Sequence, residues 1–194
     1  MYEVTLPSII IPIQSPDGRL PALVDAIRSQ WDYPIIVVDD GSGPENVRIF
    51  RALQRTGCTV LTHRVKKGVG EAIKTGVHHA KNHYPISIGY IVVASPLSCT
   101  PEAILQVADA LESLPNTLVF EGFAKKGSGI THHLLRWWHQ LSTGYAWPER
   151  GIDILGVPAI CGDTLLAQPC RPTGPSHRFY RHLSREGFPC VVLS

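Results

Sequence analysis

Short apolar runs alternate with helical patterns along the first two thirds of the chain. Runs rich in β-branched residues predict buried strands over residues 8–13, 34–38, 59–61, 87–94 and 117–121. Between them, apolar residues recur at helical spacing, which predicts helices over residues 20–30, around 47–53, over 70–83 and from Pro101 onward. Apolar strands that alternate with helices indicate a largely parallel sheet covered on both faces. The predicted fold class is therefore α/β, with three layers and a mostly parallel sheet.

The pattern changes beyond Phe123. A loop rich in Gly and Lys is followed by a predicted aromatic-rich helix around 134–141, a Gly/Pro-rich segment and a short final strand over 190–193. No linker, internal repeat or low-complexity stretch separates this tail from the rest of the chain. We therefore expect residues 1–194 to form a single domain.

Composition excludes several classes of protein. The 194 residues are 44% hydrophobic and 18% charged, with a formal net charge of +2, which is typical of a globular chain and not of a disordered one. A domain of this size buries roughly 70% of the surface that its unfolded chain exposes. The basic runs are no longer than the pairs Lys66-Lys67 and Lys125-Lys126, so nucleic acid is not an expected partner.

The cysteines and the apolar runs indicate a compartment. The 5 Cys residues are widely spread and form no CxxC pair, which argues against a disulfide framework and against a cysteine zinc site. Residues 1–13 lack the basic start of a signal peptide, and no apolar run reaches the roughly 18 residues of a spanning helix. We expect a cytoplasmic protein, with peripheral membrane contact as the alternative.

Polar residues follow the predicted strands, where ligands bind in open α/β sheets. Asp39-Asp40-Gly41-Ser42 follows the second strand, and carboxylates there either accept hydrogen bonds from a base and a ribose or cap the loop. Lys66-Lys67-Gly68-Val69-Gly70 precedes a helix, which suits a phosphate. Neither GxGxxG nor GxxxxGK[ST] occurs, which argues against a Rossmann dinucleotide site and a P-loop.

These residues together resemble an ordered family signature. Ser8-Ile-Ile-Ile-Pro12 is followed by Ile36-Val-Val-Asp-Asp-Gly-Ser42, by Gly68-Val-Gly-Glu-Ala72, and by Tyr90-Ile-Val-Val before Pro101-Glu102. This order is similar to that of family-2 glycosyltransferases with a GT-A fold. The likeness covers residues 7–115 and extends more faintly through 129–144. The nearest type in the resemblance is the polyprenyl- or dolichyl-phosphate sugar transferase.

The resemblance implies a nucleotide-sugar site, linked to UDP or GDP, at the strand ends. It divides the domain into a nucleotide-binding half over about 7–122 and a tail over about 123–194 that faces an acceptor or a partner. Asp39 and Asp40 match positions that contact the base and the ribose in the family. The implied nucleotide-binding residues are Pro12, Gln14, Asp39, Asp40, Gly41, Ser42, Lys67, Gly68 and Gly70.

The sequence departs from the family where a metal would bind. The family carries an Asp-x-Asp after the fourth strand, whose carboxylates hold Mg²⁺ or Mn²⁺ against the diphosphate. With Pro101 as anchor, this motif falls on Ala94, Ser95 and Pro96, and no acid occurs between Glu71 and Glu102. The cation expected for the family therefore lacks its ligands. Lys66 or Lys67 could offset the diphosphate charge instead; the alternative is lost or altered catalysis.

The tail supplies the remaining candidates. Glu149 and Asp153 are its acidic candidates for a catalytic base. Arg136, Trp137 and Trp138 suggest an acceptor or partner surface, because adjacent tryptophans on a helix cannot share one buried face. Such a surface suits a protein partner, a second copy of the chain or a membrane interface. His79 and His83 have the spacing of a helical metal pair but no further ligand nearby, so a solvated polar face is the favoured interpretation.

Three functional hypotheses follow. The first is a glycosyltransferase-like protein that binds a nucleotide-sugar and, if active, transfers the sugar to a lipid-phosphate or glycan acceptor. The second is a catalytically degenerate module that binds or regulates a partner. The third, a nucleotidyltransferase, needs a basic Gly-rich loop after the first strand, where residues 15–19 supply only Arg19. An open cleft opposite Asp40 favours the first hypothesis, and a cleft filled by residues 94–99 favours the second.

Overall fold

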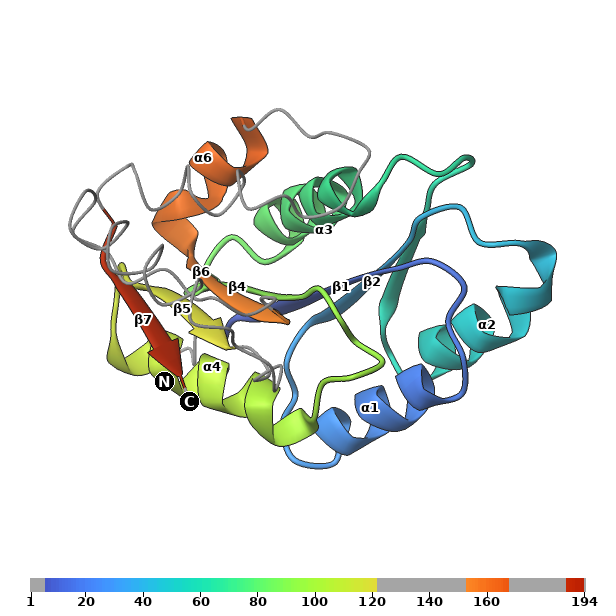
Figure 1. The fold of residues 1–194 in the computed structure, drawn as a ribbon, viewed down its shortest axis with the longest axis horizontal. Helices are drawn as coiled ribbons and strands as arrows, with labels where there is room; N and C mark the ends of the chain where they lie inside the picture. The colour runs from blue at the N-terminus through green and yellow to red at the C-terminus, as the bar shows by residue number, and fades with distance from the viewer. Residues whose placement is uncertain (1–5, 122–152, 168–187, 194) are drawn as a thin grey trace, which may run out of the picture.

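The computed structural model describes residues 6–121, 153–167 and 188–193 (Figure 1). The strands are β1 (Ser8–Ile13), β2 (Ile35–Asp39), β3 (Thr59–Thr62), β4 (Gly89–Val93), β5 (Leu118–Glu121), β6 (Ile154–Pro158) and β7 (Cys190–Leu193). The helices are α1 (Arg19–Arg28), α2 (Val47–Arg55), α3 (Val69–His83), α4 (Pro101–Ser113) and α6 (Gly162–Ala167), with 3₁₀ turns η1 (Pro44–Asn46) and η2 (Ala159–Cys161). Each strand predicted from the sequence is present, as are the four helices predicted between residues 20 and 114.

The strands form one seven-stranded sheet in the order β3-β2-β1-β4-β6-β5-β7. Every pair is parallel except those of β6, which runs antiparallel to β4 and to β5. The carboxyl ends of β1, β2, β3 and β4 therefore share one edge of the sheet. This arrangement confirms the α/β class and the mostly parallel sheet.

The sequence pattern did not predict β6 or α6. Residues 154–158 were expected to be part of an irregular Gly/Pro-rich segment, but they form the buried strand between β4 and β5. Gly156 is needed there because a Cβ on it would lie 2.8 Å from Val107 Cγ1 on α4. Pro158 ends the strand. The glycine of β6 thus allows close packing, and its proline ends the strand. From composition alone, a strand with these two residues cannot be distinguished from a loop.

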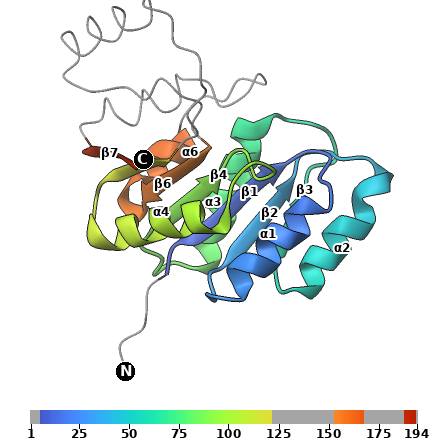
Figure 2. The same ribbon diagram turned by 60° about the horizontal axis from the view of Figure 1, so that its bottom comes forward.

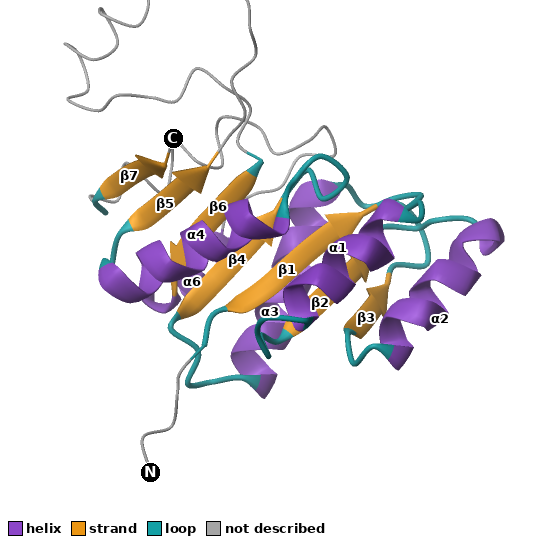
Figure 3. Ribbon diagram, turned by 90° about the horizontal axis from the view of Figure 1, so that it is seen from below, coloured by secondary structure: helices purple, strands orange, loops and turns teal. Residues whose placement is uncertain are grey.

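Helices cover both faces of the sheet (Figures 2 and 3). Alternate residues of β1 point to opposite layers: Ile9 and Ile11 pack in the core with α1, α2 and α4, and Ile10 packs with α3 and η2. Gly76 lets α3 lie directly on the sheet, since a Cβ there would lie 2.5 Å from Ile10 Cγ2. The small residues of α3 therefore allow its close approach to the sheet. No helix in the described ranges is long and apolar enough to cross a membrane.

Candidate functional site

A cleft of about 430 Å³ opens at the carboxyl edge of the sheet. Its walls come from the end of β1, the residue after β2, the loop before α3 and the loop after β4. The lining residues are Pro12, Ile13, Gln14, Asp40, Lys66, Gly68, Val69, Ala94, Ser95, Pro96, Leu97 and Ser98. The loop after β4 therefore leaves open the space opposite Asp40.

The cleft brings together part of the predicted set. Pro12, Gln14, Asp40 and Gly68 line it, and so do the three positions to which the resemblance assigns the metal motif, residues 94–96. The other predicted nucleotide-binding residues do not line it; they are Asp39, Gly41, Ser42, Lys67 and Gly70. The cation at the cleft wall is Lys66, next to the predicted Lys67.

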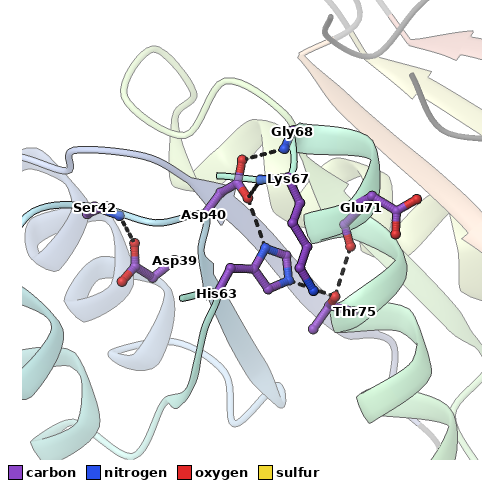
Figure 4. Close-up of polar contacts among 8 residues, drawn as sticks. All are labelled: Asp39, Asp40, Ser42, His63, Lys67, Gly68, Glu71 and Thr75. Atoms are coloured by element: carbon purple, nitrogen blue, oxygen red, sulfur yellow. Dashed lines mark hydrogen bonds and ion pairs between the residues drawn. The ribbon is translucent and has the colours of Figure 1, made fainter. Parts of the chain in front are cut away.

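Asp40 is the best-bonded side chain of the site (Figure 4). Its Oδ1 accepts hydrogen bonds from the backbone N of Lys67 and from Nδ1 of His63, both at 2.8 Å, and its Oδ2 accepts one from the backbone N of Gly68 at 2.8 Å. Its side chain is only 5% exposed. Asp40 therefore fastens the loop before α3 to the end of β2.

The environment of Asp40 favours its ionised form. Burial opposes ionisation, but the hydrogen bonds from His63, Lys67 and Gly68 outweigh it and lower the pKa of Asp40 below its usual range. The carboxylate is thus charged at neutral pH, and the protein's own donors occupy both of its oxygens.

Asp39 organises the neighbouring turn. Its Oδ1 accepts a hydrogen bond from the backbone N of Ser42 at 2.8 Å, and Ser42 Oγ accepts one from the backbone N of Ser15 at 2.9 Å. This chain of contacts joins the loop after β2 to the loop after β1. Both aspartates therefore make the contacts expected of carboxylates that cap a loop, the second of the two alternatives that the sequence left open.

Gly41 allows two loops to approach closely. Its φ is +75°, in the left-handed region, and a Cβ there would lie 2.6 Å from the backbone N of Lys66. The turn after β2 can therefore pack against the loop that carries Lys66 only because residue 41 lacks a side chain.

His63 is a site residue that the sequence analysis missed. It follows β3 directly, is buried, and bonds Asp40 through Nδ1, while its Nε2 lies 2.9 Å from Thr75 Oγ1 on α3. The available signal was the parallel pairing of two predicted strands, which brings the residues after β2 and β3 to one edge. A lone histidine carries no periodic signal of its own.

The wall next to α3 suits an anion. Gly68 precedes the helix with a φ of +96°. The first N–H groups of a helix have no acceptor within the helix, and they carry the positive end of its dipole. Lys66 adds a cationic side chain to the same wall. A phosphate placed here would meet both.

The opposite wall is held by backbone contacts. The N–H groups of Ala94 and Ser95 donate to the carbonyl of Asp153 at 2.8 and 3.4 Å, and Cys99 N donates to the carbonyl of Ser95 at 3.2 Å. The wall offers no carboxylate: among the described residues that line the cleft, Asp40 is the one acid. The part of the chain that the structure describes contains no group of three metal-ligating side chains. These residues do not fit a divalent cation.

Asp153 is the described member of the candidate catalytic acids. It directly precedes β6, and its N donates to the carbonyl of Glu121, the last residue of β5, at 3.2 Å; its side chain does not line the cleft. Burial and then the charge of Asp153 raise the pKa of Glu121. Burial and the same acids raise the pKa of the Cys99 thiol to about 12. Glu149, Arg136, Trp137 and Trp138 lie outside the described residues.

The histidines of α3 contact one another. The rings of His79 and His83 stack with their centroids 3.8 Å apart, and His83 Nδ1 donates to the carbonyl of His79 at 2.9 Å. Burial, followed by the charges of His83 and His78, lowers the pKa of His79. The contacts are those of a helix surface.

Known proteins were compared with the chain. The sequence matches the family model described as glycosyl transferase family 2 over residues 8–162. No curated protein matches it significantly. Glucosyl-3-phosphoglycerate synthase from Mycobacterium tuberculosis, solved with Mn²⁺, uridine diphosphate and glucosyl-3-phosphoglycerate, has a TM-score of 0.66 and 16% identity over 98% of this chain and 70% of that one.

A second solved structure has a related fold. 4-Diphosphocytidyl-2C-methyl-D-erythritol synthase has a TM-score of 0.58 and 11% identity, over 99% of this chain and 90% of that chain. At these identities both structures show a shared fold and no more.

Proposed function

Because the chain belongs to glycosyl transferase family 2, we propose that it binds a nucleotide-sugar, linked to UDP or GDP, in the cleft at the carboxyl ends of β1, β2 and β4. The observation that carries the proposal is the cleft itself. Its volume of about 430 Å³ lies within the range of small-molecule sites, and every residue that lines it falls inside the family match. A solved relative of the same fold is described in complex with UDP.

We further propose that the diphosphate binds without a metal. Lys66 and the first N–H groups of α3 lie on one wall and supply positive charge and donors. The family's Asp-x-Asp positions, Ala94 and Pro96, have no ligating atoms in their side chains. Asp40, the remaining carboxylate, already accepts three hydrogen bonds from the protein.

Transfer would break the bond between the anomeric carbon and the β-phosphate oxygen and form one to an acceptor oxygen of a lipid phosphate or glycan. The negative charge that develops on the leaving diphosphate would be offset by Lys66. An acceptor hydroxyl would lose its proton to a base. Of the two acidic candidates, Glu149 is favoured, because the side chain of Asp153 does not line the cleft.

A second candidate function is nucleotide-sugar binding without transfer, in a module that acts on a protein partner. The observation that favours it is the absence of a carboxylate from the β4 wall as described. Arg136, Trp137 and Trp138 are its proposed partner surface, with a second copy of the chain or a membrane as the other candidates. The two functions are separated by adding lipid-phosphate acceptors to the bound nucleotide-sugar: transfer releases free nucleoside diphosphate, whereas binding without transfer releases none.

The test of binding compares two adjacent lysines. UDP and GDP are titrated calorimetrically in EDTA against the whole chain, Lys66→Ala and Lys67→Ala. Loss of a charge-assisted contact corresponds to a weakening of about tenfold or more. We expect that loss for Lys66→Ala and little change for Lys67→Ala, because the Lys67 side chain does not line the cleft. Equal effects, or no binding by the unaltered chain, would contradict the proposal.

A further inference from the structure

His63 lies behind the cleft wall and joins three elements. Its side chain is 6% exposed and does not line the cleft. Nδ1 bonds Asp40 at the end of β2, and Nε2 lies 2.9 Å from Thr75 Oγ1 on α3 (Figure 4). No nucleotide bound in the cleft has to touch this ring, so any role of His63 must act through its neighbours.

The hydrogen-bond partners fix the protons of the ring. An ionised Asp40 accepts only, so Nδ1 must donate to it. Thr75 has a single hydroxyl proton, which it donates to the carbonyl of Glu71 at 2.9 Å. Its oxygen must then accept from Nε2. All three contacts hold together only when both ring nitrogens carry a proton.

The charged ring supports the loop of the cleft. The Asp40 carboxylate that it pairs with also accepts from the backbone N of Lys67 and of Gly68. These residues follow Lys66, and both Lys66 and Gly68 line the cleft. A neutral His63 keeps its hydrogen bond to Asp40, but its Nε2 must then accept from the Thr75 hydroxyl, which can no longer donate to the Glu71 carbonyl. The buried carboxylate also loses the positive charge beside it.

The charges around the ring come from the elements that surround it. The ring contacts Asp40, and the charged residues next in sequence to Asp40, His63 and Thr75 are Asp39, Arg64 and Lys74. Glu71 and Lys67 belong to the same network through their backbones: the Glu71 carbonyl accepts from Thr75, and the Lys67 N donates to Asp40. Of these groups, the one that pairs directly with the ring is Asp40.

We propose that His63 is a positioning residue whose protonated ring holds Asp40 and the loop of residues 64–68 in place, so that nucleotide binding in the cleft requires that proton. The ligand half of this inference rests on the proposed function. The structural half, a charged ring that orders the loop, does not.

The sign of the pH dependence follows from linkage. If nucleotide binds only the form with a charged ring, its affinity is constant while His63 is protonated and falls by up to about tenfold per pH unit once the ring loses its proton.

The structural half is tested by NMR on the free, full-length chain. The ring nitrogen shifts of His63 report its protonation, and amide exchange of Lys67 and Gly68, expressed as protection factors, reports the loop. We expect both protection factors to be high while the ring nitrogen shifts show two protons, and to fall as the ring deprotonates. Protection unchanged by that deprotonation would overturn the proposal.

The ligand half is tested by UDP titration in EDTA at several pH values. His63→Asn keeps a donor for Asp40 without a titratable ring and should abolish the pH dependence. Thr75→Val removes the acceptor for the Nε2 proton and should move the fall in affinity to lower pH, while Thr75→Ser should restore it. His83→Asn is the matched control, because that ring lies on the exposed surface of α3.

The outcomes separate the two hypotheses. A pH profile that is the same in Thr75→Val and in the unaltered chain would overturn the role of His63 even if nucleotide binds. Failure of any nucleotide to bind, together with loop protection that follows the His63 proton, would sink the proposed function and the ligand half while the structural half stands.

Discussion

The β2 side of the cleft is held by hydrogen bonds to a buried carboxylate side chain, whereas its β4 side is held by backbone hydrogen bonds. On the β2 side, one buried carboxylate binds two backbone amides and a histidine. On the β4 side, the amides of Ala94 and Ser95 donate to the Asp153 carbonyl, and the side chains from residues 94 to 98 carry no charge.

The two sides correspond to the two functions that the family resemblance assigns to this edge of the sheet, nucleotide binding and metal binding. The β2 side and the loop before α3 carry the residues that the family resemblance assigns to the nucleotide. The β4 side is where the resemblance assigns the metal, and its residues from 94 to 98 offer no carboxylate. A cleft built in this way should depend strongly on Asp40 and tolerate change between residues 94 and 98, which the following substitutions test.

The largest effect is expected for Asp40→Asn. Asn presents one acceptor oxygen where the carboxylate presents two, so buried donors among the three that bond Asp40 lose their acceptor, at a cost of about 1–3 kcal/mol for each. Urea denaturation at pH 7 measures the loss. Because the pKa of Asp40 is lowered in the folded protein, its stabilisation is present above the unfolded-state pKa and is lost as the pH falls through the folded-state pKa. The deficit of the variant should therefore shrink in acid.

Asp17→Asn serves as the control for Asp40. Asp17 pairs with Arg19 on the surface, and both side chains are about half exposed or more. Little change in the denaturation midpoint is expected. A similar loss of stability for both variants would mean that the buried hydrogen bonds of Asp40 stabilise the fold no more than a surface ion pair does.

A smaller effect is expected for Gly41→Ala. The positive φ strains alanine by about 1 kcal/mol or more, and its Cβ would press on the backbone N of Lys66. Stability should fall, and UDP affinity should fall with it because the loop carrying Lys66 must move. Gly18→Ala is the matched control: a Cβ there meets no atom within 4 Å, so neither quantity should fall. Gly41→Ala with unchanged binding would show that the loop position does not matter.

The double change Ala94→Asp with Pro96→Asp tests the β4 side directly. If these positions correspond to the family's metal motif, two carboxylates there should make UDP binding respond to Mn²⁺. We expect Mn²⁺ to tighten binding to the variant by about tenfold, or 1.4 kcal/mol, and to leave the unaltered chain unaffected. A variant that ignores Mn²⁺ would place the motif elsewhere.

The smallest effect is expected for Glu121→Gln. Burial and the charge of Asp153 raise the pKa of Glu121 in the folded protein. Its contribution to stability is therefore fully present below the unfolded-state pKa and is lost as the pH rises through the folded-state pKa. The glutamine variant should be slightly more stable than the unaltered chain at pH 7 and equal to it near pH 3. Greater stability of the unaltered chain at pH 7 would contradict the assigned environment.

Periodicity predicted most of the fold because the central strands are buried on both faces. Runs such as that of β1, buried along its whole length, cannot be mistaken for loops, and the helical spacing of apolar residues indicated α3. The strand β6 escaped prediction because one of its five residues is glycine and another is proline. Its place depends on the fit of Gly156 against α4, which is a tertiary contact.

The candidate site was predicted in part. The strand-end rule located the cleft, and the acid-poor stretch after Glu71 located its uncharged wall. The rule could not decide which of two adjacent lysines faces the cleft. It also could not predict that both carboxylate oxygens of Asp40 accept hydrogen bonds from the protein itself. Those outcomes depend on the turn at Gly41 and on His63, which meet only in the folded chain.

Metal-independent binding is the property on which the proposed function depends most: the cleft is proposed to bind a nucleoside diphosphate through Lys66 and the start of α3 without a divalent cation. Calorimetric titration of UDP and GDP against the full-length chain, once in EDTA and once in Mn²⁺, tests it most directly. We expect at least one of the two nucleotides to bind in EDTA, with an affinity that Mn²⁺ leaves unchanged. Binding that requires Mn²⁺, or no binding of either nucleotide, would contradict it.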